Sequence, residues 1–240
     1  MYYIGVDLGT SAVKLLLMEE SGKICNIVSK EYPLFFPHPG WSEQNPEDWY
    51  TQSMAGMKEL TEGIDRSQVA GISFGGQMHG LVTLDDQDQV IRPAILWNDG
   101  RTSEETDYLN NVIGKDKLSQ YTANIAFAGF TAPKILWMKK NEPEKFAKVV
   151  KIMLPKDYLA YRLQEKGVYI YLSLSLPTIG FDKCYPWGGP DKLGWSLYRN
   201  KRDFDAWCKG TEMLLNHRNP YTKTRYVDDP QIAFLDLNNE

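Results

Sequence analysis

A short polar tip at residues 77–79 carries residue types that are well suited to binding a small ligand. Gln77, Met78 and His79 follow a predicted strand, Val69–Phe74, and three glycines flank them before the next apolar run, Leu81–Leu84. Because glycine relieves the steric cost of a tight turn, we expect two strands held close together with the tip at a sheet edge. An amide, a thioether and an imidazole could contact one ligand there. The alternative is that His79 is an ordinary hydrogen-bonded turn residue.

A second polar turn follows the first predicted strand. Asp7 ends the apolar run Tyr2–Val6, and Gly9, Thr10 and Ser11 precede the next apolar run. The backbone N–H groups and two hydroxyls of this turn form a donor-rich concavity that suits phosphate oxygens. Asp7 is placed to hold Mg²⁺ through water, because this ion prefers few carboxylates and keeps its waters. Asp and Gly are also ordinary turn formers, so a purely structural turn is an equal alternative.

Two other groups of charged residues are expected to be structural. The segment Asp85–Asp88 contains three carboxylates but lacks the glycine and the later glutamate of a calcium loop, so we predict a solvated turn. Asp99 and Arg101 lie at a strand-to-helix junction, where they could line a cleft. The favoured interpretation is a hydrogen-bonded ion pair that fastens the junction.

Strand signals along the first two thirds of the chain predict a sheet that begins with an antiparallel meander. Three apolar runs separated by short polar turns open the sequence, which is typical of consecutive hairpins. The later runs are short and alternate with helical segments, and this alternation indicates one α/β domain. The expected strands are Tyr2–Val6, Val13–Met18, Ile24–Tyr32, Val69–Phe74, Leu81–Leu84, Ala94–Trp97 and Val149–Leu154.

The helix signals place covering helices between these strands. Asn45 and Pro46 form a strong helix start, and apolar residues follow at three- and four-residue intervals, as on the sheet-facing side of a helix. Thr102–Glu105 has the pattern of a capping box and opens a helical region up to Val149, with Gly114 as a break. A last helix is expected from Pro155 to Leu163. The apolar stripe of the first helix consists of Tyr50, Met54, Met57 and Leu60.

Composition limits the class of protein. The 240 residues are 42% hydrophobic and carry a net charge of -4, which favours a globular core and argues against a broadly basic nucleic-acid surface. No window is long and apolar enough for a membrane span, and the N-terminus enters a strand directly, so we expect a cytoplasmic protein. Cys25, Cys184 and Cys208 are widely spaced and are expected to be reduced thiols. The sequence leaves the oligomeric state open, a homo-oligomer included.

Taken together, these motifs resemble the FGGY carbohydrate kinases, and within them the xylulokinase group. The order and rough spacing of the motifs match over residues 1–165, and the combination of Gln-Met-His-Gly with Trp-Asn-Asp-Gly-Arg is specific. The matching segments are Asp7–Ser11, Pro37–Gln44, Gly76–Gly80, Pro93–Arg101, Gly129–Lys134 and Leu154–Leu159.

The resemblance implies a ribonuclease-H-like fold of the actin and sugar-kinase superfamily, with a mixed sheet and flanking helices. It also implies transfer of the ATP γ-phosphoryl group to D-xylulose, which gives D-xylulose 5-phosphate, with ATP and Mg²⁺ as cofactors. By residue, Asp7 matches the catalytic and magnesium-side aspartate of the family. Gly9, Thr10 and Ser11 match its phosphate turn, and Met78 and His79 match its sugar-binding pair. A donor-rich turn facing a sugar site is the layout that in-line phosphoryl transfer needs.

The resemblance ends near Lys166. We therefore predict an N-terminal kinase domain at residues 1–166 and an unmatched tail at 167–240, which is divergent or poorly packed. Family members are about twice as long, and their second lobe holds the adenine pocket and the proton-accepting aspartate. The acids of the tail, Asp203, Asp205, Asp228 and Asp229, follow no glycine-rich segment of the family type, so none is predicted as the base. A catalytically silent sugar-binding fragment, a non-functional truncated product, or a kinase for another pentulose or polyol are the alternatives.

Overall fold

The structure is a computed structural model whose chain forms two compact units, Met1–Val168 and Tyr169–Glu240. It describes residues 1–164, 170–173, 201, 205, 208, 209, 212, 213, 215–218, 223–228 and 232–236. Each unit is described by itself below. Three residues named above, Cys184, Asp203 and Asp229, lie outside the described residues.

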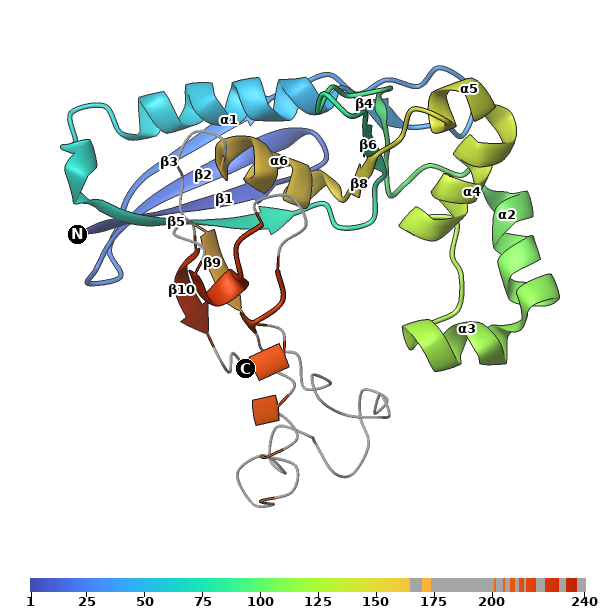
Figure 1. Cartoon of the computed structure of the whole chain (residues 1–240). Coiled ribbons are helices and arrows are strands. Elements are labelled where there is room, and N and C mark those ends of the chain that lie inside the picture. The colour runs from blue at the N-terminus through green and yellow to red at the C-terminus, as the bar shows by residue number, and fades with distance from the viewer. Residues whose placement is uncertain are drawn as a thin grey trace. The chain divides into compact units, whose positions relative to one another are not determined.

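A four-stranded mixed sheet forms the centre of the first unit (Figure 1). Its strands are β1 (Tyr2–Leu8), β2 (Ala12–Glu19), β3 (Ile24–Glu31) and β5 (Val69–Gly76), in the order β3-β2-β1-β5. The first three strands pair antiparallel, which confirms the opening meander, whereas β1 and β5 run parallel. Alternate residues of β1 and β2 are buried on one face, as the two-residue period of a strand requires.

Helix α1 (Pro46–Leu60) and helix α6 (Pro155–Gln164) pack against this buried face. Asn45 caps α1 by accepting a hydrogen bond from the N–H of Glu47, as predicted. The predicted stripe is wrong in part, because Met54 is 39% exposed while Trp49 is fully buried. The buried side of the helix is centred on Trp49, Ser53 and Gly56, because Gly56 lets the helix approach β2 closely. A Cβ at Gly56 would lie 2.5 Å from a methyl carbon of Leu15.

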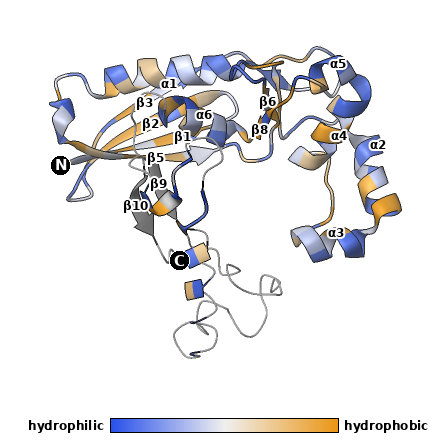
Figure 2. Ribbon diagram, in the orientation of Figure 1, coloured by the Kyte–Doolittle hydropathy of each residue, from blue (hydrophilic) through white to orange (hydrophobic). Residues whose placement is uncertain are grey.

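Hydropathy follows this packing. Figure 2 shows strands β1 and β2 mostly in hydrophobic colours, while α1 alternates between hydrophilic and hydrophobic residues. Trp49 of α1 meets Tyr158 of α6 edge to face, with ring centroids 6.4 Å apart. The two helices therefore share one core with the sheet, and its fully buried side chains include Leu8, Leu15, Leu17, Leu60, Trp49 and Tyr158.

The two strands on either side of the tip, which were predicted to be held close together, belong to different sheets. Strand β6 (Val82–Leu84) pairs antiparallel with β8 (Lys151–Met153), and the short strands β4 (Glu43–Gln44) and β7 (Ala94–Ile95) pair with each other. All three residues of β6 are buried. An apolar run of this kind fits beside any buried strand, so it does not indicate which strand will be its partner. A second apolar cluster, formed by Leu81, Ile95, Trp137 and Met138, lies at these small sheets.

The helical region comprises α2 (Ser103–Asp107), the π-helical segment η2 (Tyr108–Gly114), α3 (Lys115–Thr122), α4 (Thr131–Asn141) and α5 (Pro143–Phe146). Gly114 has a φ of +98° and separates η2 from α3, as expected of the break. The predicted capping box is absent. The hydroxyl of Thr102 makes no capping hydrogen bond and instead donates to the carbonyl oxygen of Ala128, 3.1 Å away.

The remaining described elements are small. The 3₁₀ segment η1 (Arg66–Gln68) precedes β5 in the first unit. In the second unit β9 (Ile170–Ser173) pairs parallel with β10 (Ile232–Asp236), and η3 spans Tyr226–Asp228. Cys25 and Cys208 are free thiols.

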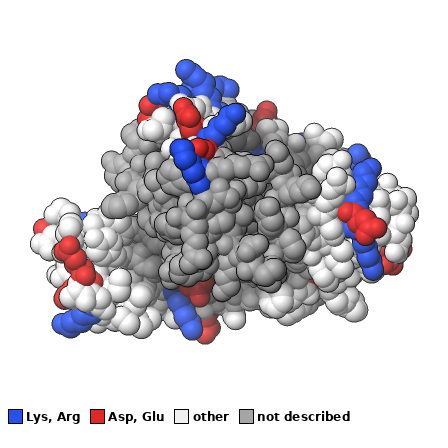
Figure 3. All heavy atoms as spheres, turned by 90° about the horizontal axis from the view of Figure 1, so that it is seen from below, with Lys and Arg blue, Asp and Glu red and all other residues white. Residues whose placement is uncertain are grey.

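Charged side chains on the surface are mixed in sign. Figure 3 shows acidic and basic side chains next to one another on the described residues visible from below. The exposed ion pairs of the second unit include Lys201 with Asp205 and Arg225 with Asp228. Among the helices that the structure describes, none combines the length and apolar content that crossing a bilayer would need.

Candidate functional site

The ends of strands β1 and β5 bring the two candidate turns together. Because these strands are parallel, their carboxyl ends lie at the same edge of the sheet, where Asp7 pairs with Gly75 and Leu8 pairs with Gly76. The N–H of Gln77 then donates to the carbonyl oxygen of Leu8, 3.0 Å away. The turn after Asp7 and the tip after Gly76 are therefore neighbours, although about 70 residues separate them in the chain.

The turn between β1 and β2 presents fewer donors than its sequence suggests. The N–H of Gly9 is used within the turn, since it lies 3.1 Å from the carbonyl oxygen of Asp7 and 3.0 Å from that of Ala12. Within the described residues, the N–H groups of Thr10 and Ser11 donate to no protein acceptor. Asp7 is exposed beside them. The groups open to an anion are thus these two N–H groups, with the Ser11 hydroxyl beside them.

The three residues of the tip differ in their surroundings. Gln77 is buried, with 8% of its surface exposed, whereas Met78 is 55% exposed. The ring of His79 is half-buried and stacks on the ring of Phe130, with a centroid distance of 4.6 Å and an interplanar angle of 14°. The hydroxyl of Thr131 lies 3.2 Å from the carbonyl oxygens of both His79 and Gly80. The loop at 129–131 therefore holds the imidazole in place.

Trp97 connects the turn to the same loop. Its indole N–H donates to the hydroxyl oxygen of Thr10 at 3.0 Å, and its side chain is nevertheless about half exposed. Gly129 lies against its backbone: a Cβ there would be 2.7 Å from the carbonyl oxygen of Trp97. The sequence marked Trp97 only as a strand end and Phe130 only as a loop residue. An aromatic residue at the end of an apolar run, directly before polar residues, was the available signal for Trp97.

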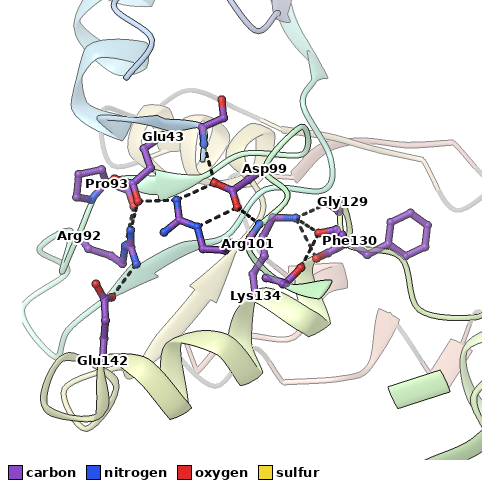
Figure 4. A network of polar contacts seen from close by, with 12 residues as sticks. Glu43, Arg92, Pro93, Asp99, Arg101, Gly129, Phe130, Lys134 and Glu142 are labelled. Carbon is purple, nitrogen blue, oxygen red and sulfur yellow. Dashed lines mark hydrogen bonds and ion pairs between the residues drawn. The ribbon is translucent and has the colours of Figure 1, made fainter. Parts of the chain in front are cut away.

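A buried ionic network lies behind this edge, and Figure 4 shows it from close by. Arg101 binds Asp99 through two side-chain hydrogen bonds of 2.9 and 2.7 Å, and a guanidinium nitrogen lies 2.7 Å from Glu43. Arg92 bridges Glu43 and Glu142. The Asp99 carboxylate also accepts the N–H of Ser42 at 2.6 Å. The predicted fastener role of the Asp99–Arg101 pair is confirmed.

Aromatic rings enclose the central guanidinium. The guanidinium carbon of Arg101 lies 3.7 Å from the ring centroid of Trp41 and 4.8 Å from that of Trp137. Arg101 and Asp99 have almost no exposed side-chain surface. Stacking and bidentate pairing favour arginine over lysine at such a position.

Lys134 of α4 points back to the loop that carries Phe130 (Figure 4). Its ammonium nitrogen lies 3.0 Å from the carbonyl oxygens of Ala128 and Phe130 and 2.5 Å from that of Gly129. The side chain is fully buried, and burial lowers the pKa of Lys134 to about 7, against the opposing influence of the Asp99 charge. This lysine therefore fixes the loop between Trp97 and His79, a role that the sequence motif did not suggest.

The donor set at the turn suits a polyphosphate better than a fully protein-bound metal ion. Within the described residues, no three His, Cys, Asp or Glu side chains gather as metal ligands would. Asp7 beside two N–H groups that find no acceptor among the described residues matches the preference of Mg²⁺ for one or two carboxylates, several waters and substrate phosphates. The residues present therefore fit a magnesium–phosphate group.

Comparisons with known proteins match the first unit. Residues 2–171 match the sequence profile of the N-terminal domain of the FGGY family of carbohydrate kinases. The xylulose kinase of Bacillus subtilis (strain 168) is 48% identical over 164 residues, which are 68% of this chain and 33% of that protein. The chain thus spans about a third of the length of the curated relatives it matches.

Solved structures give the same result for the fold. A xyloylose kinase from Brucella ovis is 42% identical, with a TM-score of 0.65, covering 73% of this chain and 36% of that one. A gluconate kinase from Lactobacillus acidophilus is 28% identical, with a TM-score of 0.66, covering 73% and 35%. The predicted α/β fold of the actin and sugar-kinase superfamily is confirmed.

Proposed function

The chain belongs to the FGGY family of carbohydrate kinases, and we propose that it supplies the sugar side and the phosphate turn of an ATP-dependent D-xylulose kinase. The reaction forms D-xylulose 5-phosphate in the cytoplasm. Met78 and His79 contact the sugar, and Thr10 and Ser11 contact phosphate oxygens. The kinase domain ends near residue 166.

One observation carries this proposal: the tip and the phosphate turn meet at one sheet edge. Gln77, which adjoins the sugar-contacting pair, donates through its side chain to the carbonyl oxygen of Gly9 at 2.9 Å. Phosphoryl transfer is chiefly a matter of placing a hydroxyl in line with a phosphate whose charge is neutralised. Two short turns held against each other supply that placement. The xylulose kinase relative from Bacillus subtilis supports the choice of sugar.

Asp7 would hold Mg²⁺ through its waters, and the ion would neutralise charge on the phosphates. The chain's own contribution is to orient the groups. The phosphates are received by the N–H groups of Thr10 and Ser11, with the exposed Asp7 beside them. The sugar hydroxyls are received by His79, whose ring is fixed by Phe130. Imidazole can both donate and accept a hydrogen bond, as a polyol requires.

Calorimetric titration with D-xylulose, without nucleotide, tests the sugar site. We expect saturable binding by the unmodified chain and none by His79→Ala. The exposed His38 provides the control, and His38→Ala should bind as the unmodified chain does. If the unmodified chain binds no D-xylulose, the assignment of the tip fails. A coupled assay for ADP release, with ATP and magnesium present, then separates a working kinase from a silent sugar-binding module.

A second candidate is a kinase-family sugar site for another polyol. The gluconate kinase from Lactobacillus acidophilus has the same fold at 28% identity, so the fold alone does not select the sugar. Titration with a panel of gluconate, glycerol and other pentuloses decides between them. Tighter binding of one of these than of D-xylulose would replace the proposed substrate.

A further inference from the structure

The Thr10 and Ser11 N–H groups of the phosphate turn are directed by the carbonyls next to them in the chain. A trans peptide unit is planar, and its C=O and N–H point in opposite directions. The Gly9 carbonyl shares a peptide unit with the N–H of Thr10, and the Thr10 carbonyl shares one with the N–H of Ser11. Whatever draws these two carbonyls inward therefore turns the two N–H groups outward.

Two buried side chains hold the Gly9 carbonyl. Its oxygen accepts from the Tyr32 hydroxyl and, at 2.9 Å, from the side-chain amide of Gln77. A carbonyl oxygen has two lone pairs, so this acceptor is saturated. Tyr32 and Gln77 are 7% and 8% exposed, and burial, with a smaller effect of the Asp7 charge, raises the pKa of Tyr32. Its hydroxyl thus stays a donor at neutral pH.

A second glutamine holds the Thr10 carbonyl. The side-chain amide of Gln44 donates to that oxygen at 2.7 Å. The orientation of the amide follows from Trp49, whose indole N–H can only donate and lies 3.1 Å from the Gln44 side-chain oxygen. The same oxygen accepts from the Gln77 amide at 3.3 Å. A buried indole therefore sets the donor direction of both glutamines.

Folding stability alone does not explain why residue 77 is a glutamine. The side-chain oxygen of Gln77 is buried and accepts no hydrogen bond from the described residues. Such an unsatisfied acceptor lowers the free energy of unfolding. An amide at this position is explained by the hydrogen bonds that it donates.

We propose that Gln44, Gln77 and Tyr32 are positioning residues that hold the Gly9 and Thr10 carbonyls inward, so that the Thr10 and Ser11 N–H groups face a polyphosphate. This inference rests on the proposed function for the identity of the anion. It adds that the phosphate turn is shaped by Gln77, the residue adjoining the sugar-contacting pair. Sugar-side and phosphate-side geometry are then linked through one side chain.

The test uses nuclear magnetic resonance of the amide groups in the complete chain, with magnesium tripolyphosphate as the probe. Gln77→Leu, Tyr32→Phe and their double variant remove donors to Gly9, and Gln44→Leu removes the donor to Thr10. Gln120→Leu, at an exposed position of α3, is the matched control. Amide exchange is recorded without ligand, and urea unfolding reports the folded fraction.

The expected pattern is specific to each peptide unit. In the unmodified chain, the Thr10 and Ser11 amides exchange freely and shift on adding tripolyphosphate. The double variant alters amide exchange mainly at Thr10. Gln44→Leu alters it at Ser11 and also at Thr10, because the Gln44 side-chain oxygen accepts a hydrogen bond from Gln77. Each of these two variants weakens tripolyphosphate binding about tenfold. Tyr32→Phe or Gln77→Leu alone has a smaller effect, because one donor to Gly9 remains.

Three results would overturn the proposal. One is unchanged Thr10 and Ser11 exchange in folded double and Gln44→Leu variants, and another is an equal change in Gln120→Leu. The third is loss of the folded state in every variant except the control, which would assign these side chains to core stability. If the Thr10 and Ser11 amide signals of the unmodified chain do not shift on adding tripolyphosphate, the proposed phosphate role fails. The exchange pattern without ligand still decides the positioning role.

Discussion

At the scale of single residues, the orientation of the His79 ring depends on its contact with one aromatic ring. His79 is half-buried, and its ring stacks on Phe130 at a centroid distance of 4.6 Å. An imidazole that is free to rotate would lose entropy on binding a ligand, and a stacked one has already lost it. The contact with Phe130 therefore favours binding without touching the ligand.

Phe130→Leu should weaken D-xylulose binding about tenfold or less, because an aromatic pair contributes ~0.5–1.5 kcal/mol. The effect should be smaller than that of His79→Ala, which removes the contact itself. Calorimetry measures both. Phe36→Leu is the control, since Phe36 is 65% exposed. Equal affinities of Phe130→Leu and the unmodified chain would show that the stack does not orient the imidazole.

The sequence predicts which residue types gather at the site better than it predicts how their atoms are used. The side-chain chemistry of Asp7, Thr10 and His79 and their places at strand ends predict their gathering at the site. The engagement of the Gly9 N–H within its own turn depends on local backbone geometry, which composition does not report. The Phe130 stack joins residues about 50 positions apart, and only the tertiary fold brings them together.

At the scale of secondary-structure elements, the end of β5 sets the approach of the tip to the turn. Gly76 has a φ of +133°, and a Cβ there would lie 2.5 Å from the Leu8 carbonyl oxygen and 2.7 Å from the Leu8 nitrogen. Backbone atoms cannot move aside as a flexible side chain can. Gly75, by contrast, has open space around an added Cβ.

Gly76→Ala should therefore lower the free energy of unfolding by ~2 kcal/mol or more and abolish D-xylulose binding, since strain and a backbone clash add. Gly75→Ala is the control and should change stability little. Urea unfolding and calorimetry measure the two effects. Similar stabilities of the two variants would mean that β5 can end in an ordinary conformation.

The ionic network joins elements that are distant in the chain. Asp99 and Arg101 follow β7, Glu43 lies in β4, and Glu142 follows α4. Asp99→Ala should cost about 3 kcal/mol of unfolding free energy, because it leaves Arg101 buried with less compensation. Glu104 pairs with Lys140 at the exposed surface, so Glu104→Gln should have no measurable effect. Comparable losses in both variants would contradict the distinction between buried and exposed pairs.

Element positions follow from local signals where those signals are strong. The meander, the Asn45 cap and the helix after Pro155 were predicted, because turn chemistry, capping and periodicity agree there. The partner of β6 was not predicted, and the sheet-facing side of α1 was predicted only in part, since Met57 packs against the core whereas Met54 is exposed. Both depend on close packing, such as that of Gly56 on Leu15, which a periodic pattern does not encode.

At the scale of the molecule, proton balance between folded and unfolded states links the site to stability. Burial lowers the pKa of Lys134 to about 7, whereas an unfolded lysine titrates near ~10.4. Between these values the unfolded chain binds more protons, so stability rises with pH. Burial raises the pKa of Tyr158 to about 12, and that of Tyr32 also rises. Above about pH 10 the unfolded tyrosines lose protons that the folded state keeps, so stability falls.

The first unit should therefore be most stable in mildly alkaline solution, with stability rising from about pH 7 to 9 and falling above about pH 10. Lys134→Met should remove the rise, because it removes the lysine whose pKa burial lowers, and should leave the alkaline fall. Lys139→Met, at an exposed position of the same helix, is the control and should keep both limbs. Urea midpoints at half-unit pH steps measure the curves. A rise that survives in Lys134→Met would mean that another group carries it, and that Lys134 is as readily protonated inside the fold as in water.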